Sequence, residues 1–329
     1  MKIAVLGAGA WGTALGVRLA GHAEVRLWTR NPAHAQDMAR ESVNTRYLPG
    51  HTLPASLHPT ADLAAACKEA DILIAATPTI GFREQLNQLK ALRADQPLAW
   101  LCKGFETGTR KLPHEVLAET WPEHRHAAAL SGPSFAQEVA QGLPAALTLA
   151  APDLAFARTL AQNLHDPRLR LYASTDVVGV ELGGALKNVI AIAAGLSDGL
   201  GFGLNARAAL VTRGLMELTR LGLKRGGRPE TFMGLSGMGD LMLTCTGNLS
   251  RNRQLGQRLA AGERLEAALA ALGHVAEGVN TALEADALAR ELGVDMPITH
   301  AVASILRGDM PPGEAVAALL ARGLKDEGQ

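Results

Sequence analysis

The chain has 329 residues, of which 47% are hydrophobic and 19% charged, a composition typical of a globular protein of about two domains. Its 32 Lys and Arg residues balance 32 Asp and Glu residues, so there is no basic excess to neutralise a nucleic-acid backbone. Three cysteines without paired spacing argue against a disulfide framework, and the ten histidines show no metal-ligand spacing; we expect a cytoplasmic protein with no bound metal.

The first half of the chain alternates short apolar runs with segments whose apolar residues recur about every 3.6 positions. This alternation predicts a mainly parallel sheet with helices on both faces. The predicted strands are Lys2–Leu6, Glu24–Trp28, Asp71–Ala76, Leu98–Cys102, Ala127–Leu130, Ala146–Leu149 and Leu169–Tyr172. Predicted helices between them include Phe82–Leu92, Lys111–Thr120 and Leu154–Leu164. No signal peptide is expected, because the first strand pattern starts almost at Met1.

After Tyr172 the strand pattern stops and the periodic segments are helical. These segments are Val180–Leu196, Ala206–Leu221, Arg253–Ala261, Val279–Leu292 and Ile298–Arg307. We therefore predict a doubly wound α/β Rossmann-type domain over residues 1–178 and an all-α substrate-binding and catalytic domain over residues 179–329. The apolar stretch Val189–Leu196 is too short for a membrane span, so no membrane insertion is expected. The helix Ala206–Leu221 is a candidate for pairing two copies in a homodimer.

A GxGxxG pattern, Gly7-Ala8-Gly9-Ala10-Trp11-Gly12, follows the first strand at once and begins a helical segment. In a dinucleotide site, Gly7 allows the tight turn, Gly9 lets the backbone approach the pyrophosphate, and Gly12 lets the helix pack on the strand. The helix N-terminus attracts the phosphates. The pattern predicts binding of NAD(H) or NADP(H). The alternative is an ordinary strand–helix turn rich in small residues.

Two basic residues follow predicted strands, at the edge where ligands bind in such sheets. The second strand ends in Thr29-Arg30, where an NAD-specific site usually has an acidic residue, so Arg30 favours the 2′-phosphate of NADP. Lys103, which follows Leu98–Cys102, is a candidate contact to a phosphate or to the cofactor. The alternatives are an Arg in a solvated loop and a Lys that simply leaves the sheet.

A lysine lies in the middle of an apolar helix, in Gly183-Gly184-Ala185-Leu186-Lys187-Asn188-Val189. Burying an ammonium is costly unless it is paired or its pKa falls. Lys187 is therefore a candidate proton donor to a carbonyl oxygen that receives a hydride at carbon. We expect Gly183 and Gly184 to leave room for a ligand above it. The alternative is a structural lysine in a buried salt bridge.

Two further polar clusters follow. Asp240 comes after a glycine-rich turn and is expected to hold Lys187 or a substrate hydroxyl, with a helix cap as the alternative. Ser250-Arg251-Asn252 precedes a helix and combines a hydroxyl, a guanidinium and an amide, which suits a phosphate. The alternative for Ser250 is again a helix cap.

The motifs together resemble the bacterial NAD(P)-dependent glycerol-3-phosphate dehydrogenases, over nearly the whole chain. They are Gly-Ala-Gly-Ala-Trp-Gly-Thr (7–13), Lys-Gly (103–104), Gly-Pro-Ser-Phe-Ala (132–136), Gly-Ala-Leu-Lys-Asn-Val-Ile-Ala (184–191), Asn-Ala-Arg-Ala-Ala-Leu (205–210), Gly-Asp-Leu (239–241) and Ser-Arg-Asn (250–252). The resemblance implies reduction of dihydroxyacetone phosphate to sn-glycerol 3-phosphate, for glycerophospholipid synthesis, with substrate between the two domains.

The resemblance also implies a set of site residues. Lys187 would be the proton donor and acceptor. The substrate would contact Lys103, Gly132, Ser134, Lys187, Asp240, Ser250, Arg251 and Asn252. The cofactor site would include Gly7, Gly9, Ala10, Trp11, Gly12, Arg30, Lys103, Ala136, Arg251, Val275 and Glu277.

Two other functions remain open at this stage. One is a related two-domain 3-hydroxyacid or ketopantoate-type reductase, which needs a carboxylate-binding group rather than the Ser-Arg-Asn helix start. The other is a non-catalytic dinucleotide sensor, which would have no need for Lys187 in an apolar helix.

Overall fold

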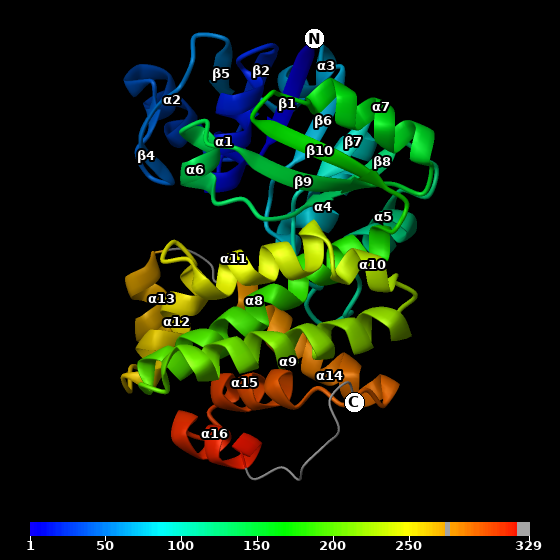
Figure 1. Ribbon diagram of the computed structural model, residues 1–329. Helices are drawn as coiled ribbons and strands as arrows, with labels where there is room; N and C mark the ends of the chain where they lie inside the picture. Colours follow the sequence, from blue (N-terminus) through cyan, green and yellow to red (C-terminus); the bar gives the residue numbers. More distant parts are fainter. Residues whose placement is uncertain (274–276, 321–329) are drawn as a thin grey trace. The chain divides into compact units, whose positions relative to one another are not determined.

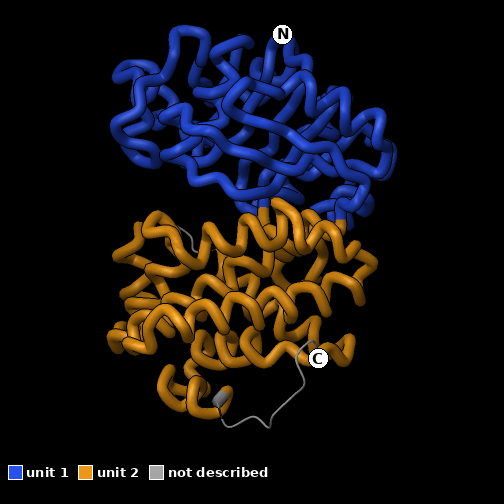
Figure 2. Tube along the Cα trace, in the orientation of Figure 1, with its two compact units in different colours: residues 1–102, 113–177 blue, residues 103–112, 178–329 orange. Residues whose placement is uncertain are grey.

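The computed structural model describes residues 1–273 and 277–320 of the chain. The chain forms two compact units, which Figure 2 colours separately. Unit 1 comprises Met1–Cys102 and Pro113–Val177, and unit 2 comprises Lys103–Leu112 and Val178–Gln329. After Val177 the chain leaves unit 1, and everything from Val178 onward belongs to unit 2.

The loop 103–112 belongs to unit 2, although it falls within the predicted first domain, residues 1–178. Its Phe105 and Leu112 are buried in one apolar cluster with Leu182 and Leu186 of unit 2. Apolar side chains at both ends of the loop therefore fix it there, and Lys103 at its start is a residue of unit 2.

Unit 1 is built on an eight-stranded sheet with the strand order β10-β9-β8-β7-β6-β1-β2-β5 (Figure 1). All neighbouring strands are parallel except β8 and β9. The strands are β1 (Lys2–Leu6), β2 (Glu24–Trp28), β5 (Leu57–Thr60), β6 (Ile72–Ala75), β7 (Leu98–Trp100), β8 (Ala127–Ser131), β9 (Ala145–Ala150) and β10 (Leu169–Ser174). The chain builds outward from β1 on one side and then returns to β6 on the other. This reversal creates a switch point at the carboxyl ends of β1 and β6, where ligands bind in open α/β sheets.

Two strands inside the sheet, β6 and β8, are buried along their whole length. All four residues of β6 and all five of β8 are buried, which requires cover on both faces of the sheet. The predicted doubly wound domain is confirmed, with all seven predicted strands in the sheet. The edge strand β5 was not predicted, because its sequence Leu57-His58-Pro59-Thr60 lacks an apolar run and contains a proline, which only an edge tolerates. The small sheet of β3 (Val43–Asn44) and β4 (Leu48–Thr52) was not predicted either.

The helices of unit 1 connect these strands. They are α1 (Ala10–Leu19), α2 (Pro32–Glu41), α3 (Leu63–Lys68), the short 3₁₀ turn η1 (Thr79–Gly81), α4 (Phe82–Ala91), α5 (Pro113–Thr120), α6 (Ala136–Ala140) and α7 (Leu154–Leu164). The polar helix α2 was not predicted, although Asn31 caps it and proline stands at its first position.

The described part of unit 2, apart from its loop 103–112, is helical. Its helices are α8 (Val177–Gly199, whose first residue closes unit 1), α9 (Gly203–Lys224), α10 (Pro229–Phe232), the π-helical turn η2 (Leu235–Gly239), α11 (Asp240–Thr246), α12 (Arg251–Ala260), α13 (Leu265–Leu272), α14 (Glu277–Leu292), α15 (Pro297–Arg307) and α16 (Pro312–Leu320). All five predicted helices are confirmed. The short segments α10, η2, α11, α13 and α16 were not predicted, because helices of about two turns or fewer give too few apolar repeats to reveal a period.

Helix α8 is the centre of unit 2. It has 23 residues and is long and apolar enough to cross a membrane, yet 94% of its most apolar window is buried inside the protein. The apolar stretch Val189–Leu196 is therefore part of a longer apolar helix, and the prediction that shortness rules out a membrane span is wrong. Burial, not length, identifies α8 as a core helix.

Candidate active site

The glycine turn after β1 has the geometry that a dinucleotide site needs. Gly7 has φ +139°, and a Cβ atom there would lie 2.6 Å from the carbonyl oxygen of Ala76 at the end of β6. A Cβ atom on Gly12 would lie 2.0 Å from the carbonyl oxygen of Gly7. At Gly9, in contrast, such a Cβ would meet no atom of the described residues within 4 Å beyond its own neighbours in the chain. Two glycines therefore let α1 pack against the strands, and the third leaves its backbone open to a ligand.

Residues from a distant part of unit 1 lie beside this turn. The indole N–H of Trp11 donates to the carbonyl oxygen of Ser134 at 2.9 Å and to its hydroxyl at 3.2 Å. The Ser134 hydroxyl donates to the carbonyl oxygen of Gly132, which has φ +144°. Ala136 begins α6, which packs against α1. The predicted residues Trp11, Gly132, Ser134 and Ala136 are thus brought together with the glycine turn.

Arg30 lies just beyond β2 and is exposed. The residue after it, Asn31, accepts hydrogen bonds from two backbone N–H groups of α2, at 3.0 and 3.3 Å. The side chain of Asn31 thus caps α2, whereas the exposed Arg30 guanidinium can be reached by a ligand from solvent. No carboxylate occupies the position where an NAD-specific site usually has one.

Unit 2 contains a buried cluster of two lysines and one aspartate. Lys187 of α8 donates a hydrogen bond to Oδ1 of Asp240, and Lys103 donates to Oδ2 of the same carboxylate at 2.9 Å. The side chain of Asp240 is 1% exposed, that of Lys187 11% and that of Lys103 16%. The predicted link between Asp240 and Lys187 is confirmed, and Lys103 joins it; the link is also the buried salt bridge that the alternative describes.

Two positive charges and one negative charge share this interior site. Burial lowers the pKa of Lys187 to about 8; the Asp240 carboxylate opposes this shift, and the Lys103 ammonium adds to it. An amine with a pKa close to neutral can both give and take a proton in this range. The cluster can therefore perform acid–base chemistry.

The turn that delivers Asp240 packs directly on α8. A Cβ atom on Gly183 would lie 2.3 Å from the carbonyl oxygen of Ser236 in η2. Gly183 therefore makes room for protein backbone, and the expectation that it leaves space for a ligand is wrong. The predicted alternative of a helix cap does not describe Asp240 either, since its carboxylate binds the lysines and Gly239 precedes α11 at the cap position.

The Ser250-Arg251-Asn252 segment begins α12 as predicted. The Ser250 hydroxyl accepts a hydrogen bond from the backbone N–H of Arg253 at 3.3 Å, so the capping alternative is realised. The Asn252 amide donates to Oδ1 of Asn188 at 2.9 Å and accepts from the N–H of Gly278 at 3.2 Å. The side chain between them, Arg251, is exposed.

Asn188 was not singled out from the sequence. Its position next to Lys187 in the same apolar helix was the available signal, because a buried amide needs a partner as a buried amine does. Thr244 donates its hydroxyl to the carbonyl oxygen of Asp240 at 2.6 Å, a hydrogen bond within one helix that gives it no separate role in the site. Nothing in its sequence surroundings distinguishes it from an ordinary helical threonine.

One more predicted cofactor residue, Glu277, belongs to α14. Glu277 is its first residue, and burial raises the pKa of its carboxyl above the usual range, against the opposing effect of Arg251, Lys103 and Lys187. Glu277 is thus electrostatically linked to the lysine cluster. Val275 lies outside the described residues.

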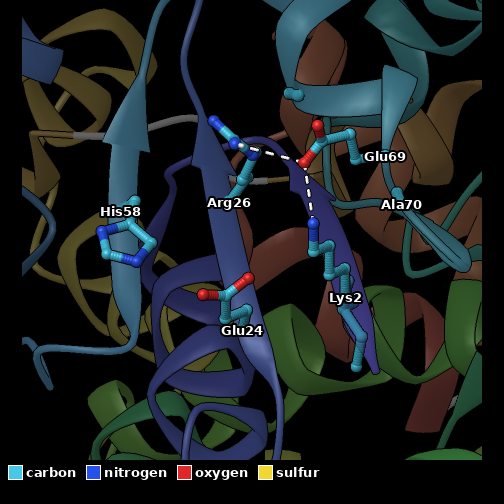
Figure 3. Close-up of a pocket in the computed structure, with 8 residues that line it drawn as sticks. Lys2, Glu24, Arg26, His58, Glu69 and Ala70 are labelled. Atoms are coloured by element: carbon cyan, nitrogen blue, oxygen red, sulfur yellow. Dashed lines mark hydrogen bonds and ion pairs between the residues drawn. The ribbon is translucent and has the colours of Figure 1, made fainter.

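A cavity of about 350 Å³ lies elsewhere, at the amino end of β1, opposite to the end that carries Gly7. It is lined by Lys2, Ile3, Glu24, Arg26, His58, Ala66, Glu69 and Ala70 (Figure 3). Its basic residues Lys2 and Arg26 face Glu69, at 2.8 and 3.9 Å. The cavity contains none of the predicted site residues.

Comparisons with known proteins agree on one family. The model of the NAD-dependent glycerol-3-phosphate dehydrogenase N-terminus matches residues 2–157, and that of the C-terminus matches residues 176–317. The chain is 57% identical to glycerol-3-phosphate dehydrogenase [NAD(P)+] of Thiobacillus denitrificans, with 99% of this chain and 100% of the relative covered. The protein of the same name from Nitrosospira multiformis is 56% identical, with 99% of both chains covered.

Solved structures give the same result. The crystal structure of glycerol-3-phosphate dehydrogenase from Coxiella burnetii matches with a TM-score of 0.93 and 44% identity, over 98% of this chain and 99% of that one. A ketopantoate reductase from Ralstonia eutropha matches with a TM-score of 0.59 and 18% identity, over 96% and 100% of the two chains, which is a likeness of fold alone.

Proposed function

Because the chain belongs to the NAD-dependent glycerol-3-phosphate dehydrogenases, we propose that it reduces dihydroxyacetone phosphate to sn-glycerol 3-phosphate with NAD(P)H, and that it also catalyses the reverse reaction. The observation that carries this proposal is Lys187, a buried amine on α8 that Asp240 holds. Ketone reduction needs a proton donor of this kind at the oxygen atom.

Unit 1 is proposed to be the dinucleotide-binding domain. The open backbone at Gly9 and the N-terminus of α1 suit a pyrophosphate, while Trp11 and Ala136 line the same region. Arg30 is proposed to bind the 2′-phosphate of NADP. When bound, the nicotinamide supplies the hydride.

Unit 2 is proposed to be the substrate-binding and catalytic domain. Lys187 donates a proton to the oxygen of the ketone during reduction and takes it back during oxidation. Asp240 keeps the amine in place, and Lys103 adds a second positive charge near the oxygen as it becomes negative. Charges that are already positioned in a dry site stabilise such an oxyanion without reorganisation.

The start of α12 is proposed to bind the substrate phosphate. Arg251 is exposed and provides a planar set of donors. Besides the hydrogen bonds described above, the Ser250 hydroxyl carries a proton and the Asn252 amide a second N–H, and these are the proposed donors to the phosphate. Gly132 and Ser134 of unit 1 are proposed as further substrate contacts.

We further propose that the protein works in the cytoplasm, where its product enters glycerophospholipid synthesis, and that it forms a homodimer. The buried free thiols of Cys67, Cys102 and Cys245 support a reducing compartment. Gel filtration with light scattering tests the dimer, which a single mass near 34.5 kDa would contradict.

Steady-state oxidation of NADPH and NADH tests the main proposal. We expect turnover with dihydroxyacetone phosphate and a much lower kcat/KM with dihydroxyacetone, because only the phosphorylated ketone uses the binding energy of its phosphate for orientation. Ketopantoate is assayed in parallel as the substrate expected for the alternative function, a ketopantoate-type reductase. A higher kcat/KM with ketopantoate than with dihydroxyacetone phosphate would reject the proposed function.

A further inference from the structure

The helix that begins with Arg251 is locked against the helix that carries Lys187. A Cβ atom on Gly195 of α8 would lie 1.9 Å from the carbonyl oxygen of Arg253, and one on Gly256 of α12 would lie 2.1 Å from the carbonyl oxygen of Ile192. Only glycine permits so close an approach of two backbones. Helix α12 therefore has a defined position along α8.

Two polar links lie on either side of this glycine contact. Toward the start of α8, Asn188 binds Asn252. Toward its end, Asp198 accepts a hydrogen bond from Nε of Arg253 at 2.7 Å, with both side chains largely buried. Asp198 also accepts from Nη1 of Arg207 in α9, at 3.2 and 3.1 Å. A carboxylate that binds two guanidinium groups in the interior is fixed in orientation.

Arg253 continues this link into the loop before α12. Its Nη1 donates to Oδ1 of Asn248 at 3.1 Å, and its backbone N–H donates to the cap hydroxyl of Ser250. The neighbouring Gln254 donates to the carbonyl oxygen of Asn248 at 2.7 Å. One guanidinium thus ties the end of α8 to the loop that leads into Arg251.

We propose that Asp198 and Arg253 are positioning residues that hold Arg251 in place for the substrate phosphate. This inference rests on the proposed function, since it assumes that Arg251 binds a phosphate. Asp198 follows Lys187 by eleven residues, which is about 16 Å along a helix. The pair therefore acts on phosphate binding and not on the transfer of the proton.

Kinetics of Asp198→Asn and Arg253→Lys test the inference. Lysine keeps the charge of Arg253, but its single ammonium cannot bind Asp198 and Asn248 in the same geometry. In both variants we expect the KM for dihydroxyacetone phosphate to rise by about 10- to 100-fold. The kcat/KM for unphosphorylated dihydroxyacetone and the pH at which kcat is half-maximal are expected to stay as in the wild type.

A double-mutant cycle with Arg251→Ala shows whether Asp198 affects the KM for dihydroxyacetone phosphate through Arg251. If Asp198 acts through Arg251, Asp198→Asn raises the KM little further in the Arg251→Ala background. The matched control is Asp166→Asn, which removes another largely buried carboxylate from its partner Arg18 in unit 1. This control is expected to leave the KM unchanged.

Two results would overturn the inference: an equal loss of kcat/KM for the phosphorylated and unphosphorylated ketones, or additive effects in the cycle. Circular dichroism shows whether each variant folds. If Asp198→Asn does not fold, the kinetics of the milder variant Arg253→Lys decide whether the inference holds. Failure of the proposed function is recognised separately, because the wild-type enzyme would then show no preference for the phosphorylated ketone.

Discussion

Among the single residues, Lys187, Lys103 and Asp240 form a chemically unusual cluster, because two ammonium groups share one buried carboxylate. With both amines protonated, the three buried side chains carry one excess positive charge. Two ammonium groups already positioned around one buried carboxylate can stabilise a bound group that becomes negative. The developing alkoxide of a ketone during reduction is such a group. The pairing that holds the two amines in the interior thus also places them to serve the reaction.

We expect Lys187→Ala to lower turnover by about 10²- to 10⁴-fold, because the proton donor is lost. The fold is expected to survive, since Asp240 keeps Lys103 as a partner. Cofactor affinity, measured by fluorescence titration with NADPH, should remain near the wild-type value. A near-normal turnover number in this variant would exclude Lys187 as the proton donor.

The pH dependence of turnover provides a test in which two variants are expected to shift the midpoint of kcat in opposite directions. Reduction requires protonated Lys187, so kcat is expected to fall as the pH rises through about 8, where burial places the pKa of this amine. The Asp240 carboxylate raises that pKa and the Lys103 ammonium lowers it. Asp240→Asn is therefore expected to move the midpoint below that of the wild type, and Lys103→Met above it. Profiles of kcat at saturating substrate would contradict this if both midpoints moved in the same direction.

Arg30 allows a prediction about cofactor choice. Replacing it with Asp removes a partner of the 2′-phosphate and adds a carboxylate that repels it. We expect the affinity for NADPH to fall by about 10- to 100-fold, with a much smaller change for NADH. Dissociation constants for both cofactors, measured on the same preparation, provide the internal control. An equal decrease for NADPH and NADH would show that Arg30 does not contact the phosphate.

From the sequence, the chemical role of these residues could be predicted better than the identity of the residues that they contact. A lysine in an apolar helix indicates a buried amine whatever the fold, so Lys187 could be recognised. The packing of Gly183 against Ser236 could not be predicted, because it depends on which backbone comes to lie on α8. The same holds for Asn252, whose amide binds Asn188, 64 residues away in the chain.

Among the helices, the N-terminus of α15 is capped by a side chain of another helix, α9. Its own cap residue, Met296, has no side chain that can accept hydrogen bonds from the first turn. Glu217 of α9 does so instead. Its carboxylate accepts from the N–H of Ile298 at 2.6 Å and from the N–H and hydroxyl of Thr299, both at 3.0 Å. The first turn of α15 thus depends on a residue of a different helix.

Glu217 makes stability depend on pH. Burial raises its pKa to about 7, although the hydrogen bonds oppose this. The folded protein therefore holds a proton that the unfolded chain releases near pH 4.5, and the free energy of unfolding falls by about 3 kcal/mol as the pH rises from 4.5 to 7. Glu217→Gln is expected to remove this contribution, so that the variant gains stability relative to the wild type across that range.

Urea unfolding at several pH values measures this difference. Glu230→Gln, at an exposed position of α10, is the matched control and is expected to follow the wild type at every pH. A constant difference in urea midpoint between Glu217→Gln and the wild type from pH 4.5 to 8 would show that Glu217 does not titrate there.

Elements with long apolar runs or long periodic patterns were predicted correctly, and short or polar ones were not. Strand β6 and helix α8 are buried on all sides, and such burial requires an apolar sequence. Helix α2 has few apolar residues, and β5 is an edge strand with a proline. Their existence follows from tertiary packing, which no local pattern expresses.

At the scale of the whole molecule, the balance of charges has a consequence that no single site reveals. Acidic and basic side chains are equal in number, and the isoelectric point is about 7.2. Ten histidines add positive charge below their usual pKa of about 6.5. Net charge keeps protein molecules apart in solution, so this protein lacks that repulsion near neutral pH.

We therefore expect solubility at low salt to have a minimum near pH 7 and to rise on either side, as measured by precipitation with polyethylene glycol. Arg158→Glu in α7 and Lys224→Glu at the end of α9 change exposed residues, one in each unit. Each reversal changes the net charge by −2, so the double variant starts from −4 instead of zero at pH 7. Its solubility minimum is expected to move to acidic pH with activity unchanged. A minimum that stayed near pH 7 in the double variant would mean that exposed apolar side chains, not net charge, control association.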